Sequence, residues 1–358
     1  MDTQEKLKLI EEVGEEIIGK EELVELLNSG KNIYAYDGFE PSGQIHIAQG
    51  ILRVINVNKL TKAGVKFKFY VADWFGMLNN KMGGDLEKIK VVGEYFVEVW
   101  KAAGMDLKNV EFIWASDFIN STPEYWETVL KLSMNSTVQR VLRCGQIMGR
   151  EESTSNPSAQ IMYPLMQAAD IHHLGVQIAQ LGLDQRKVNM LAREVFPKIN
   201  LPKPIAVHHH MLLGLKQKET SAEGVEKKIE QKMSKSDPMS AIFMNDSSED
   251  IKRKMNKAFC PEGIVEDNPV LEYARYLVFE KFDNFVIERP EKWGGNMEFS
   301  SYKDLEKAFV AKEIHPMDLK SSVAKYVNQM IQPVREHFEN DQKAKALLEK
   351  VKSFQVTK

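Results

Sequence analysis

Cysteine and long apolar runs are scarce in this 358-residue sequence. Cys144 and Cys260 are its two cysteines, and their separation gives neither a CxxC metal knuckle nor a disulfide framework. No stretch approaches the roughly 20 apolar residues that a membrane span requires. The N-terminal stretch MDTQEKLKLIEEVGEE is acidic and lacks the apolar core of a signal peptide. We therefore expect a cytoplasmic protein without membrane association, with both cysteines buried as small hydrophobic residues.

Charge of either sign is in little excess, since the formal net charge is -3. The charge is unevenly distributed: residues 1–29 hold nine acidic residues against three lysines, and residues 320–358 hold eight basic residues against four acidic ones. A basic C-terminal end is compatible with contact to RNA and equally with a solvated helix face. The content of 43% hydrophobic and 28% charged residues is typical of a soluble globular protein, and the length suits two domains.

Strand-like and helix-like patterns alternate through the first part of the chain. Residues 4–29 are typical of two short acidic helices. The buried strands expected after them lie at residues 32–37, 66–73, 110–116, 175–181 and 204–207. The helices expected with these strands begin near residues 46, 85, 122, 160 and 185. Such alternation predicts an α/β fold with a doubly wound parallel sheet, which binds ligands at the carboxyl ends of its strands.

The pattern changes after residue 215. Residues 216–232 are highly charged and poor in apolar side chains, which favours a solvated, mobile excursion over core structure. From about residue 246 onward the patterns are helical and are punctuated by proline and glycine. We place a domain boundary near residues 235–250 and expect a mainly α-helical second domain.

Residues 160–174, QIMYPLMQAADIHHL, form a mostly apolar stretch that suits a buried helix. Tyr163, Gln167 and Asp170 are spaced by four and by three residues, so they share one helix face. Buried polar groups need partners, and two kinds of partner remain open: an internal hydrogen-bond network or a bound polar molecule. Pro164 fits best in a first helical turn, which would place Tyr163 at the helix entrance.

Two separate stretches have features of a polyphosphate site. The turn GFEPSGQIH at residues 38–46 lies between a strand and a helix, where backbone N–H groups and a helix N-terminus can meet a phosphate. His46 and Gln49, three residues apart at the start of that helix, can face the same anion. Lys232 and Lys235 lie in a flexible segment, and two ammonium groups on a mobile loop can close over a polyphosphate. A capping histidine and a charged surface loop are the alternatives when each stretch is taken alone.

The two stretches resemble the signature motifs of class I aminoacyl-tRNA synthetases. Residues 232–236, KMSKS, match the second motif letter for letter. The first motif, His-Ile-Gly-His, is matched in part by His46-Ile47-Ala48-Gln49, in which Ala48 replaces glycine and Gln49 replaces the second histidine. Nearly the whole chain resembles the tyrosyl-tRNA synthetases of the archaeal and eukaryotic cytosolic type. The matching stretches are YDGFEPSGQIHIAQG, YPLMQAADI, LGLDQRKVNMLARE, KMSKSDP, FCPEGIVEDNP and HPMDLK.

The resemblance implies an ATP-dependent tyrosine–tRNA ligase with a Rossmann-like catalytic domain at residues 31–240. It also implies acidic N-terminal helices at residues 1–30, a helical anticodon-binding domain at residues 241–358, and a homodimer. The partners would be L-tyrosine, ATP with Mg²⁺, and tRNA(Tyr). The alternatives are a tryptophanyl-tRNA synthetase, against which the phenol-suited pair Tyr36 and Asp170 argues, and a catalytically inactive tRNA-binding paralogue, against which the intact lysine motif argues.

Carried over onto this sequence, the family's tyrosine pocket falls on five polar residues. Tyr36 and Asp170 would bind the phenol, because a carboxylate accepts from a phenolic O–H and a tyrosine hydroxyl both donates and accepts. The groups expected around the substrate's α-amino end are those of Tyr163, Gln167 and Gln185. A substrate without the hydroxyl would leave Tyr36 and Asp170 unpaired in a dry pocket, which predicts discrimination against phenylalanine.

The implied ATP site combines the first turn with the second motif. The resemblance assigns catalytic roles to His46, Gln49, Lys232 and Lys235. These residues would hold ATP and, with Mg²⁺, neutralise pyrophosphate. The residues expected to bind ATP are Glu40, Ser42, Gly43, His46, Leu213, Lys232, Met233, Ser234, Lys235 and Ser236, and Met211–Leu215 would form the adenine-side wall. Adjacent strand residues point to opposite faces, so we expect no zinc site at His208, His209 and His210 and no structural metal.

In the second domain, Trp293 and Asp318 align with positions that the family uses on the anticodon. An indole can stack on a splayed base, and a carboxylate can accept from the Watson–Crick edge of a guanine. The alternative for Trp293 is a cap on the helical core beside Gly294 and Gly295.

Overall fold

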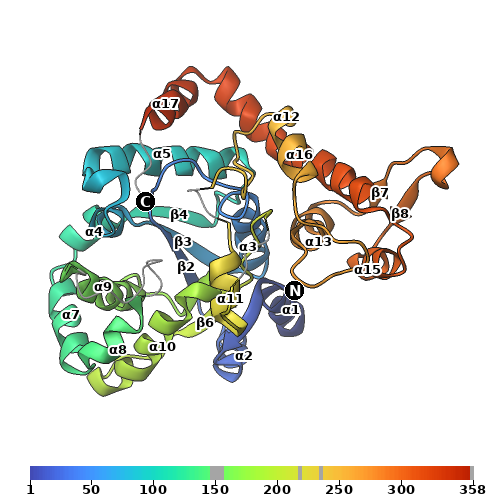
Figure 1. Ribbon diagram of the computed structural model, residues 1–358. Helices are drawn as coiled ribbons and strands as arrows, with labels where there is room; N and C mark the ends of the chain where they lie inside the picture. The colour runs from blue at the N-terminus through green and yellow to red at the C-terminus, as the bar shows by residue number, and fades with distance from the viewer. Residues whose placement is uncertain (146–156, 217–219, 234–236, 355–358) are drawn as a thin grey trace.

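The centre of the molecule is a six-stranded β-sheet, seen in a computed structural model that describes residues 1–145, 157–216, 220–233 and 237–354 (Figure 1). The strands are β1 (Gly14–Ile18), β2 (Ile33–Phe39), β3 (Val65–Val71), β4 (Val110–Trp114), β5 (Ile178–Gly182) and β6 (Ile205–His209). Their order across the sheet is β1-β6-β5-β2-β3-β4, and of these six strands β1 alone runs antiparallel to its neighbour. The predicted parallel α/β sheet is therefore confirmed, with one antiparallel edge strand added.

Helices cover both faces of the sheet. The helices of the sheet-containing part are α1 (Thr3–Val13), α2 (Lys20–Asn28), α3 (Ile51–Lys62), α4 (Asp73–Leu78), α5 (Leu86–Ala102), α6 (Ala115–Asn120), α7 (Tyr125–Met134), α8 (Val138–Leu142), α9 (Ala159–His173) and α10 (Arg186–Val195). Short 3-10 turns are η1 (Lys81–Gly84), η3 (Leu183–Gln185) and η4 (Phe196–Ile199). The buried residues of α1, α3 and α5 share one core, and those of α7, α9 and α10 share another. No helix in the described part of the chain combines the length and the apolar character needed to cross a membrane.

Alternate residues of the central strands enter these two cores. In β3, Phe67 and Phe69 join the core that contains α3 and α5, whereas Tyr70 joins the core that contains α9. In β2, Ala35 and Tyr36 divide in the same way. Successive strand residues point to opposite faces, so the sheet carries both tyrosines into the layer of α9.

The N-terminal part differs from the sequence-based prediction in one element. The two acidic helices are present as α1 and α2, but the break between them is the strand β1. This strand pairs with β6, for example Ile17 with Val207 and Ile18 with Ala206. Its sequence, GEEII, is too short to establish an alternating pattern, and pairing with the free edge of β6 makes it a strand.

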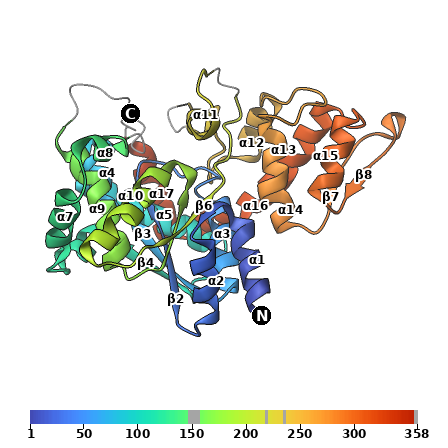
Figure 2. The same ribbon diagram turned by 90° about the horizontal axis from the view of Figure 1, so that it is seen from below.

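The second half of the chain is mainly helical, as predicted. Its elements are α11 (Gly224–Gln231), α12 (Ser248–Asn256), α13 (Pro269–Tyr273), the π-helix η5 (Ala274–Val278), α14 (Phe279–Lys281), β7 (Phe285–Ile287), η6 (Glu291–Trp293), β8 (Met297–Phe299), α15 (Tyr302–Val310), α16 (Pro316–Asn340) and α17 (Gln342–Ser353). The hairpin β7–β8 was missed because three-residue strands carry no readable pattern. Figure 2 shows α12–α15 to one side of the sheet-containing part, whereas α17 returns to pack on α5.

His210, directly after β6, joins three parts of the molecule. Its Nδ1 lies 3.0 Å from Oε2 of Glu15 in β1, and its Nε2 lies 3.2 Å from Oε1 of Glu272 in α13. The imidazole stacks on Tyr276 with ring centroids 4.1 Å apart, and Lys228 of α11 pairs with Glu15 as well. Burial alone would lower the pKa of His210, but the hydrogen bonds and charges of Glu15 and Glu272 outweigh burial and raise the pKa to about 9.

We expect His210 to contribute stability that depends on pH. Because its folded-state pKa lies above the ordinary value of 6.5, this contribution is complete below that pH and is lost as the pH rises through about 9. The substitution His210→Gln should lower the free energy of unfolding by roughly 2 kcal/mol near neutral pH and by much less near pH 10, as measured by urea denaturation.

The matched control is His172→Gln, which removes a half-buried histidine whose pKa burial lowers. Its effect on the free energy of unfolding should not shrink between neutral pH and about pH 10. A deficit of His210→Gln that stays constant over this range would contradict the role given to the charge.

Candidate active site

The candidate site lies at the carboxyl ends of β2 and β5, where the strand order reverses. The chain builds β2, β3 and β4 in one direction and places β5 and β6 on the other side of β2. β2 ends at Phe39 and continues into the turn that carries Glu40, Ser42 and Gly43. β5 runs directly into η3, which ends at Gln185. Such a reversal leaves a crevice beyond the strand ends, where open α/β sheets bind ligands.

Helix α9 forms one wall of this crevice. Tyr163, Gln167 and Asp170 are all buried, as their shared helix face predicted. Pro164 lies inside α9, which begins at Ala159, so the expectation that Pro164 occupies the first turn and leaves Tyr163 at the helix entrance is wrong. Pro164 has no N–H to donate within α9, and the residues around it are buried in the core that α9 shares with α7 and α10.

Asp170 is a buried carboxylate held by two phenols. The Oη atoms of Tyr70 in β3 and Tyr125 in α7 donate hydrogen bonds to Asp170 Oδ1 at 2.9 Å and 2.8 Å. Burial raises the pKa of Asp170 to about 7, while the hydrogen bonds from Tyr125 and Tyr70 act in the opposite direction. The internal network considered from the sequence therefore exists, but among the described residues it uses one of the two carboxylate oxygens.

Tyr36 in β2 supplies a second polar atom without a protein partner. Its Oη is buried and makes no well-formed hydrogen bond to a described residue, although the Gln167 side chain lies near enough to oppose the rise in its pKa. Burial, together with the nearby charges of Asp170 and Asp37, raises the pKa of Tyr36 well above its ordinary value, so the phenol is neutral. A buried hydroxyl without a partner is costly, so Tyr36 Oη and Asp170 Oδ2 together suit a ligand that both donates and accepts.

Hydrogen bonds join the remaining predicted tyrosine-site residues across the crevice. Tyr163 Oη donates to Glu40 Oε1 at 2.5 Å, and Gln167 Nε2 donates to Gln185 Oε1 at 3.1 Å. Asn79 Nδ2 donates to Glu40 Oε2 at 2.9 Å from the end of α4. Glu40, which we expected on the ATP side, therefore also contacts the wall formed by α9.

The first signature motif lies in a turn that precedes α3. The N–H groups of Gln49 and Gly50 donate to His46 O at 2.9 Å and 2.8 Å, and the helix begins at Ile51. The prediction that His46 and Gln49 stand in the first turn of the helix is therefore wrong. Ile47 is apolar and lies four residues before Ile51, a spacing typical of a helix, but its N–H donates to Ile242 O at 2.8 Å instead.

Backbone pairing fixes this turn to the segment after the second motif. Met244 N–H donates to Ile45 O at 3.0 Å, and His46 forms an isolated β-bridge with Phe243. Gly43 in the same turn has a φ of +89°, a conformation that favours glycine. Met244 also approaches Gly50 so closely that an added Cβ there would lie 2.4 Å from its sulfur. The first signature motif is thus held by close backbone contact to the segment that follows the second motif.

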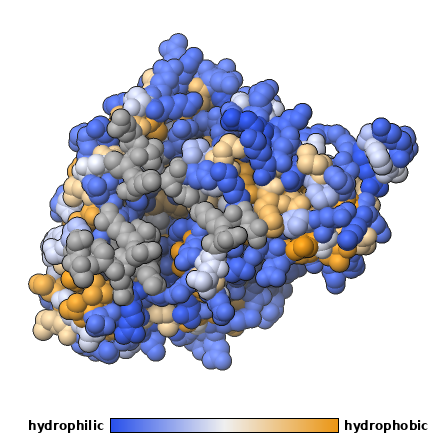
Figure 3. Space-filling view, in the orientation of Figure 1, coloured by the Kyte–Doolittle hydropathy of each residue, from blue (hydrophilic) through white to orange (hydrophobic). Residues whose placement is uncertain are grey.

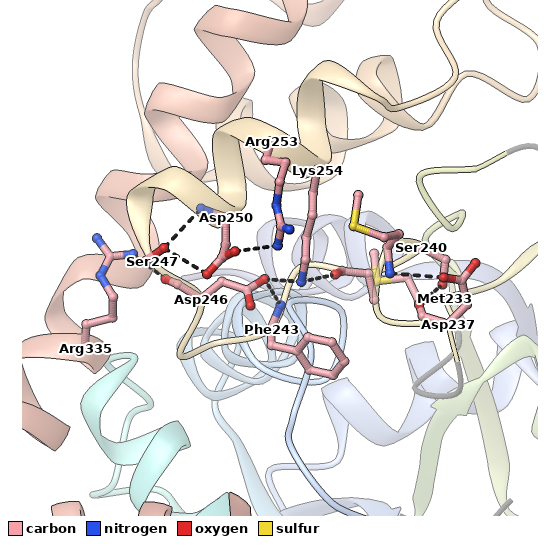
Figure 4. A network of polar contacts seen from close by, with 12 residues as sticks. Met233, Asp237, Ser240, Phe243, Asp246, Ser247, Asp250, Arg253, Lys254 and Arg335 are labelled. Atoms are coloured by element: carbon pink, nitrogen blue, oxygen red, sulfur yellow. Dashed lines mark hydrogen bonds and ion pairs between the residues drawn. The ribbon is translucent and has the colours of Figure 1, made fainter.

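A buried lysine anchors the segment that follows the second motif (Figure 4). Lys254 of α12 donates from Nζ to Ala241 O at 3.0 Å and to Asp246 Oδ2 at 2.6 Å. The same carboxylate oxygen accepts from Phe243 N–H at 2.8 Å, and Arg335 of α16 donates to Asp246 O at 3.0 Å. Two helices of the C-terminal part therefore hold the segment that pairs with the first motif.

Two residues of the KMSKS motif, Lys232 and Met233, belong to the described part of the chain. Lys232 Nζ donates to Asp184 Oδ2 at 2.9 Å, and its backbone bridges to Leu213. Burial would raise the pKa of Asp184, but Lys232 and Arg53 outweigh burial and lower it, so the carboxylate is charged. The predicted ATP-site residues outside the described part of the chain are Ser234, Lys235 and Ser236.

The three adjacent histidines have protein partners. His208 Nδ1 lies 2.7 Å from Glu16 Oε2, and His209 Nδ1 lies 2.6 Å from Gln180 Nε2, while His210 lies between two carboxylates. Within the described ranges, no group of three or more His, Cys, Asp or Glu side chains is arranged to hold a metal ion.

Trp293 and Asp318 lie in the helical part, away from this crevice. Trp293 ends η6 and is 66% exposed, so it does not cap the core, and Asp318 lies half-buried in the first turn of α16. Arg289 connects their surroundings, because its guanidinium donates to Gly295 O at 2.7 Å and to Glu313 O at 2.8 Å.

Several residues that shape the site were not identified from the sequence. Tyr70 had a usable signal, since strand alternation places it on the same face of the sheet as Tyr36. The others are Tyr125, Asn79, Asp184 and Lys254. Their contacts span 8 to 48 residues along the chain and follow no periodic pattern, so tertiary packing alone reveals them.

Comparison with known proteins agrees with this geometry. The family model described as tRNA synthetases class I (W and Y) matches residues 28–332. The chain is 49% identical to tyrosine–tRNA ligase 1, cytoplasmic, of Arabidopsis thaliana, over 100% of this chain and 90% of the relative. It is 41% identical to the tyrosine–tRNA ligase of Thermococcus kodakarensis, over 98% of this chain and 99% of the relative.

Solved structures give the same result. The tyrosyl-tRNA synthetase of Leishmania major in complex with tyrosinol has a TM-score of 0.90 at 46% identity and covers 99% of this chain, which spans 61% of the Leishmania protein. The tyrosyl-tRNA synthetase of Pyrococcus horikoshii complexed with L-tyrosine has a TM-score of 0.90 at 38% identity, over 98% of this chain and 100% of that protein. The chain therefore belongs to the class I tRNA synthetases for tryptophan and tyrosine, and within them to the tyrosine–tRNA ligases.

Proposed function

We propose that the chain activates L-tyrosine with ATP and transfers the tyrosyl group to the 3′ end of tRNA(Tyr). The observation that carries this proposal is the pairing of Tyr36 Oη, which is buried without a hydrogen bond to a described residue, with Asp170 Oδ2, the carboxylate oxygen to which neither Tyr70 nor Tyr125 donates. A substrate phenol donates its hydrogen to the carboxylate and accepts from Tyr36. The indole of tryptophan has an N–H donor but no acceptor, so it leaves Tyr36 unpaired.

The α-amino end of the substrate is assigned to the opposite end of this pocket. Tyr163, Gln167 and Gln185 offer one hydroxyl and two amide oxygens, which accept from an ammonium group. Glu40, which accepts from Tyr163 at 2.5 Å, adds a negative charge to the same end. This arrangement leaves the substrate carboxylate directed toward the turn after β2.

The reaction has two steps and needs no protein nucleophile. A carboxylate oxygen of tyrosine attacks the α-phosphorus of ATP, and pyrophosphate leaves to give tyrosyl-adenylate. A ribose hydroxyl at the 3′ end of the tRNA then attacks the carbonyl carbon of the adenylate, and AMP leaves. The protein contributes by positioning the reactants and by stabilising the charge that builds on the phosphates.

The ATP side is assigned to the two signature motifs. The turn that carries Ser42, Gly43, His46 and Gln49 would hold the nucleotide, and Mg²⁺ enters as part of the ATP substrate. Lys232 and Lys235 would neutralise pyrophosphate, with Met233, Ser234 and Ser236 as further ATP contacts and Leu213 in the adenine-side wall. Asp184 holds Lys232 at 2.9 Å, and the ammonium group of Lys232 keeps further N–H donors for the phosphates.

We assign anticodon recognition to the helical part. Trp293 presents an exposed indole for stacking, and Asp318 presents a carboxylate that can accept from a guanine. We propose the division into residues 1–30, 31–240 and 241–358, in which β1 of the first segment completes the sheet of the second. In this division, α17 of the third segment packs back on the second.

A homodimer is supported by an exposed apolar stripe on α7 and α8. Its members follow one another at intervals of four residues, at positions Trp126, Leu130, Met134, Val138 and Leu142, with exposures from 37% to 82%. The hydrophobic patch at the lower left of Figure 3 lies over these two helices. Contiguous apolar surface of this kind is typical of a protein–protein interface, and a second copy with the same stripe fits it by two-fold symmetry.

We also assign the protein to the cytoplasm. The Arabidopsis relative at 49% identity carries the word cytoplasmic in its name. The proposed tRNA substrate is used in translation, which agrees with this location.

The proposed reaction is tested by ATP–pyrophosphate exchange with tyrosine and with tryptophan. We expect exchange with tyrosine, a roughly 100-fold higher KM for tyrosine in Asp170→Ala, and a nearly unchanged KM for ATP, because the buried phenol loses its charged partner. Lys235→Ala should instead slow adenylate formation in a pre-steady-state assay without changing tyrosine affinity. Exchange with tryptophan alone, or none at all, would overturn the proposal, and equal damage to both substrates would mean that the roles are misassigned.

Trp293→Ala tests the anticodon assignment. We expect the KM for tRNA(Tyr) in aminoacylation to rise by roughly 10-fold, because a base loses its stacking partner, while ATP–pyrophosphate exchange stays unchanged. The matched control is Val310→Ala, which shortens another exposed apolar side chain of the helical part. An unchanged KM for tRNA in Trp293→Ala would remove this residue from the proposed interface.

The dimer is tested by light scattering coupled to size-exclusion chromatography. We expect the wild type at micromolar concentration to have twice the mass of one chain, and Leu130→Asp or Met134→Asp to shift it to one chain, because each places a charge in an apolar contact. The control Ile264→Asp places the same charge at an exposed apolar residue of the helical part. A wild type with the mass of one chain would refute the dimer.

A further inference from the structure

Two tyrosines behind the proposed substrate pocket are arranged around a single atom of Asp170. Tyr70 Oη lies 2.9 Å and Tyr125 Oη lies 2.8 Å from Asp170 Oδ1. None of the described residues donates a hydrogen bond to Oδ2. The carboxylate is therefore divided into one oxygen committed to the protein and one oxygen left for a ligand.

Packing fixes both phenol rings. The Tyr70 ring contacts Phe75 and Phe118 edge-on, with centroids 6.2 Å and 6.0 Å apart. The Tyr125 ring contacts Trp126 and His173, with centroids 5.6 Å and 5.5 Å apart. Because both rings are buried among such neighbours, their hydroxyl groups hold fixed positions, and so does the plane of the carboxylate to which they donate.

The Tyr125 hydroxyl has one hydrogen and two acceptors in reach. Met166 O lies 3.0 Å away and Asp170 Oδ1 lies 2.8 Å away. When Asp170 is charged, the hydrogen of Tyr125 is directed to the carboxylate, which is the stronger acceptor. When Asp170 is protonated on Oδ1, Tyr125 can accept that proton's hydrogen bond and donate to Met166 O instead.

We propose that Tyr70 and Tyr125 are positioning residues that occupy Asp170 Oδ1, aim Oδ2 at the substrate phenol, and thereby set the preference for tyrosine over phenylalanine. The inference deepens the proposed function and rests on it, since it takes tyrosine as the substrate. Tyr70 and Tyr125 act through Asp170 and need no contact with the substrate. Removing either hydroxyl frees Oδ1 to compete for the phenol and lets the carboxylate turn.

The electrostatic surroundings give this arrangement a dependence on pH. Among the residues that the structure describes, the ionisable groups that face Asp170 are four phenols: Tyr36 from β2, Tyr70 from β3, Tyr125 from α7 and Tyr163 from α9 itself. Burial raises the pKa of all four, so they stay neutral while Asp170, with a pKa raised by burial to about 7, changes charge. Loss of a phenol donor removes a bond that favours the charged carboxylate and raises the pKa of Asp170 further.

The test compares Tyr70→Phe, Tyr125→Phe and the wild type of the full chain. Both substitutions remove one oxygen atom and keep the ring that packs in the core. In ATP–pyrophosphate exchange we expect the KM for tyrosine to rise roughly 10-fold with little change in kcat or in the KM for ATP. The kcat/KM for phenylalanine should not change. The ratio of kcat/KM for tyrosine to kcat/KM for phenylalanine should therefore fall by the same factor. The acid limb of kcat/KM for tyrosine should move to higher pH.

The matched control is Tyr95→Phe, which removes a buried phenolic hydroxyl that donates to Asn245 Oδ1 in the other core. Tyr95→Phe should keep the wild-type ratio of kcat/KM for tyrosine to kcat/KM for phenylalanine. It should also keep the wild-type pH dependence of kcat/KM for tyrosine. Thermal unfolding of each variant separates a folding defect from a change in selectivity, and the two tyrosines provide independent variants.

Three outcomes decide the inference. A reduced ratio of tyrosine to phenylalanine together with a shifted acid limb, in whichever variants fold, supports it. An unchanged ratio in folded Tyr70→Phe or Tyr125→Phe overturns it while tyrosine exchange by the wild type leaves the proposed function standing. Absence of tyrosine exchange in the wild type overturns the proposed function, and the inference with it.

Discussion

The proposed substrate-binding half of the fold depends on keeping the carboxylate of Asp170 inside an apolar core. A carboxylate withdrawn from water persists only where donors replace the lost hydration. Here the donors come from β3 through Tyr70 and from α7 through Tyr125, while β2 places Tyr36 nearby without a hydrogen bond to the carboxylate. Three elements must therefore converge on α9 before the pocket exists. The same convergence leaves one carboxylate oxygen of Asp170 and the phenolic oxygen of Tyr36 for a ligand. The arrangement that stabilises the buried carboxylate therefore also gives the proposed preference for tyrosine.

The proposed phosphate-binding half is built on backbone contact rather than on burial of a charge. The turn that contains His46 pairs with residues 242–244, although about 200 residues separate them along the chain. Lys254 and Arg335 hold that segment from the helical part, and Glu272 accepts from Leu213 N–H at 2.9 Å before the charged excursion. The loop with the KMSKS motif thus begins and ends on contacts with the helical part. The C-terminal helices therefore support the proposed phosphate-binding half of the molecule and also carry the proposed RNA-binding surface.

Local sequence patterns predicted the buried strands and the amphipathic helices. They missed the short strands that exist because they pair with a neighbouring strand. Alternation of strands and helices gave the parallel sheet, because buried strands and amphipathic helices carry strong hydrophobic periods. The strand β1 and the hairpin β7–β8 carry no such period, since hydrogen bonds to a neighbouring strand define them. The start of α3 was placed too early because Ile47 fits the helical stripe, yet its N–H bonds to another chain segment.

The sequence by itself determined the family, the two motifs and the polar face of α9, because each of these is written in local spacing. Tyr163, Gln167 and Asp170 share a face through the helical repeat alone. Only the tertiary structure determined which residues contact this polar face of α9. It surrounded Asp170 with Tyr70 and Tyr125, paired Tyr163 with Glu40, and left Tyr36 without a partner among the described residues. These contacts join residues 45 to 123 positions apart, and no local pattern encodes the distance between two atoms brought together by packing.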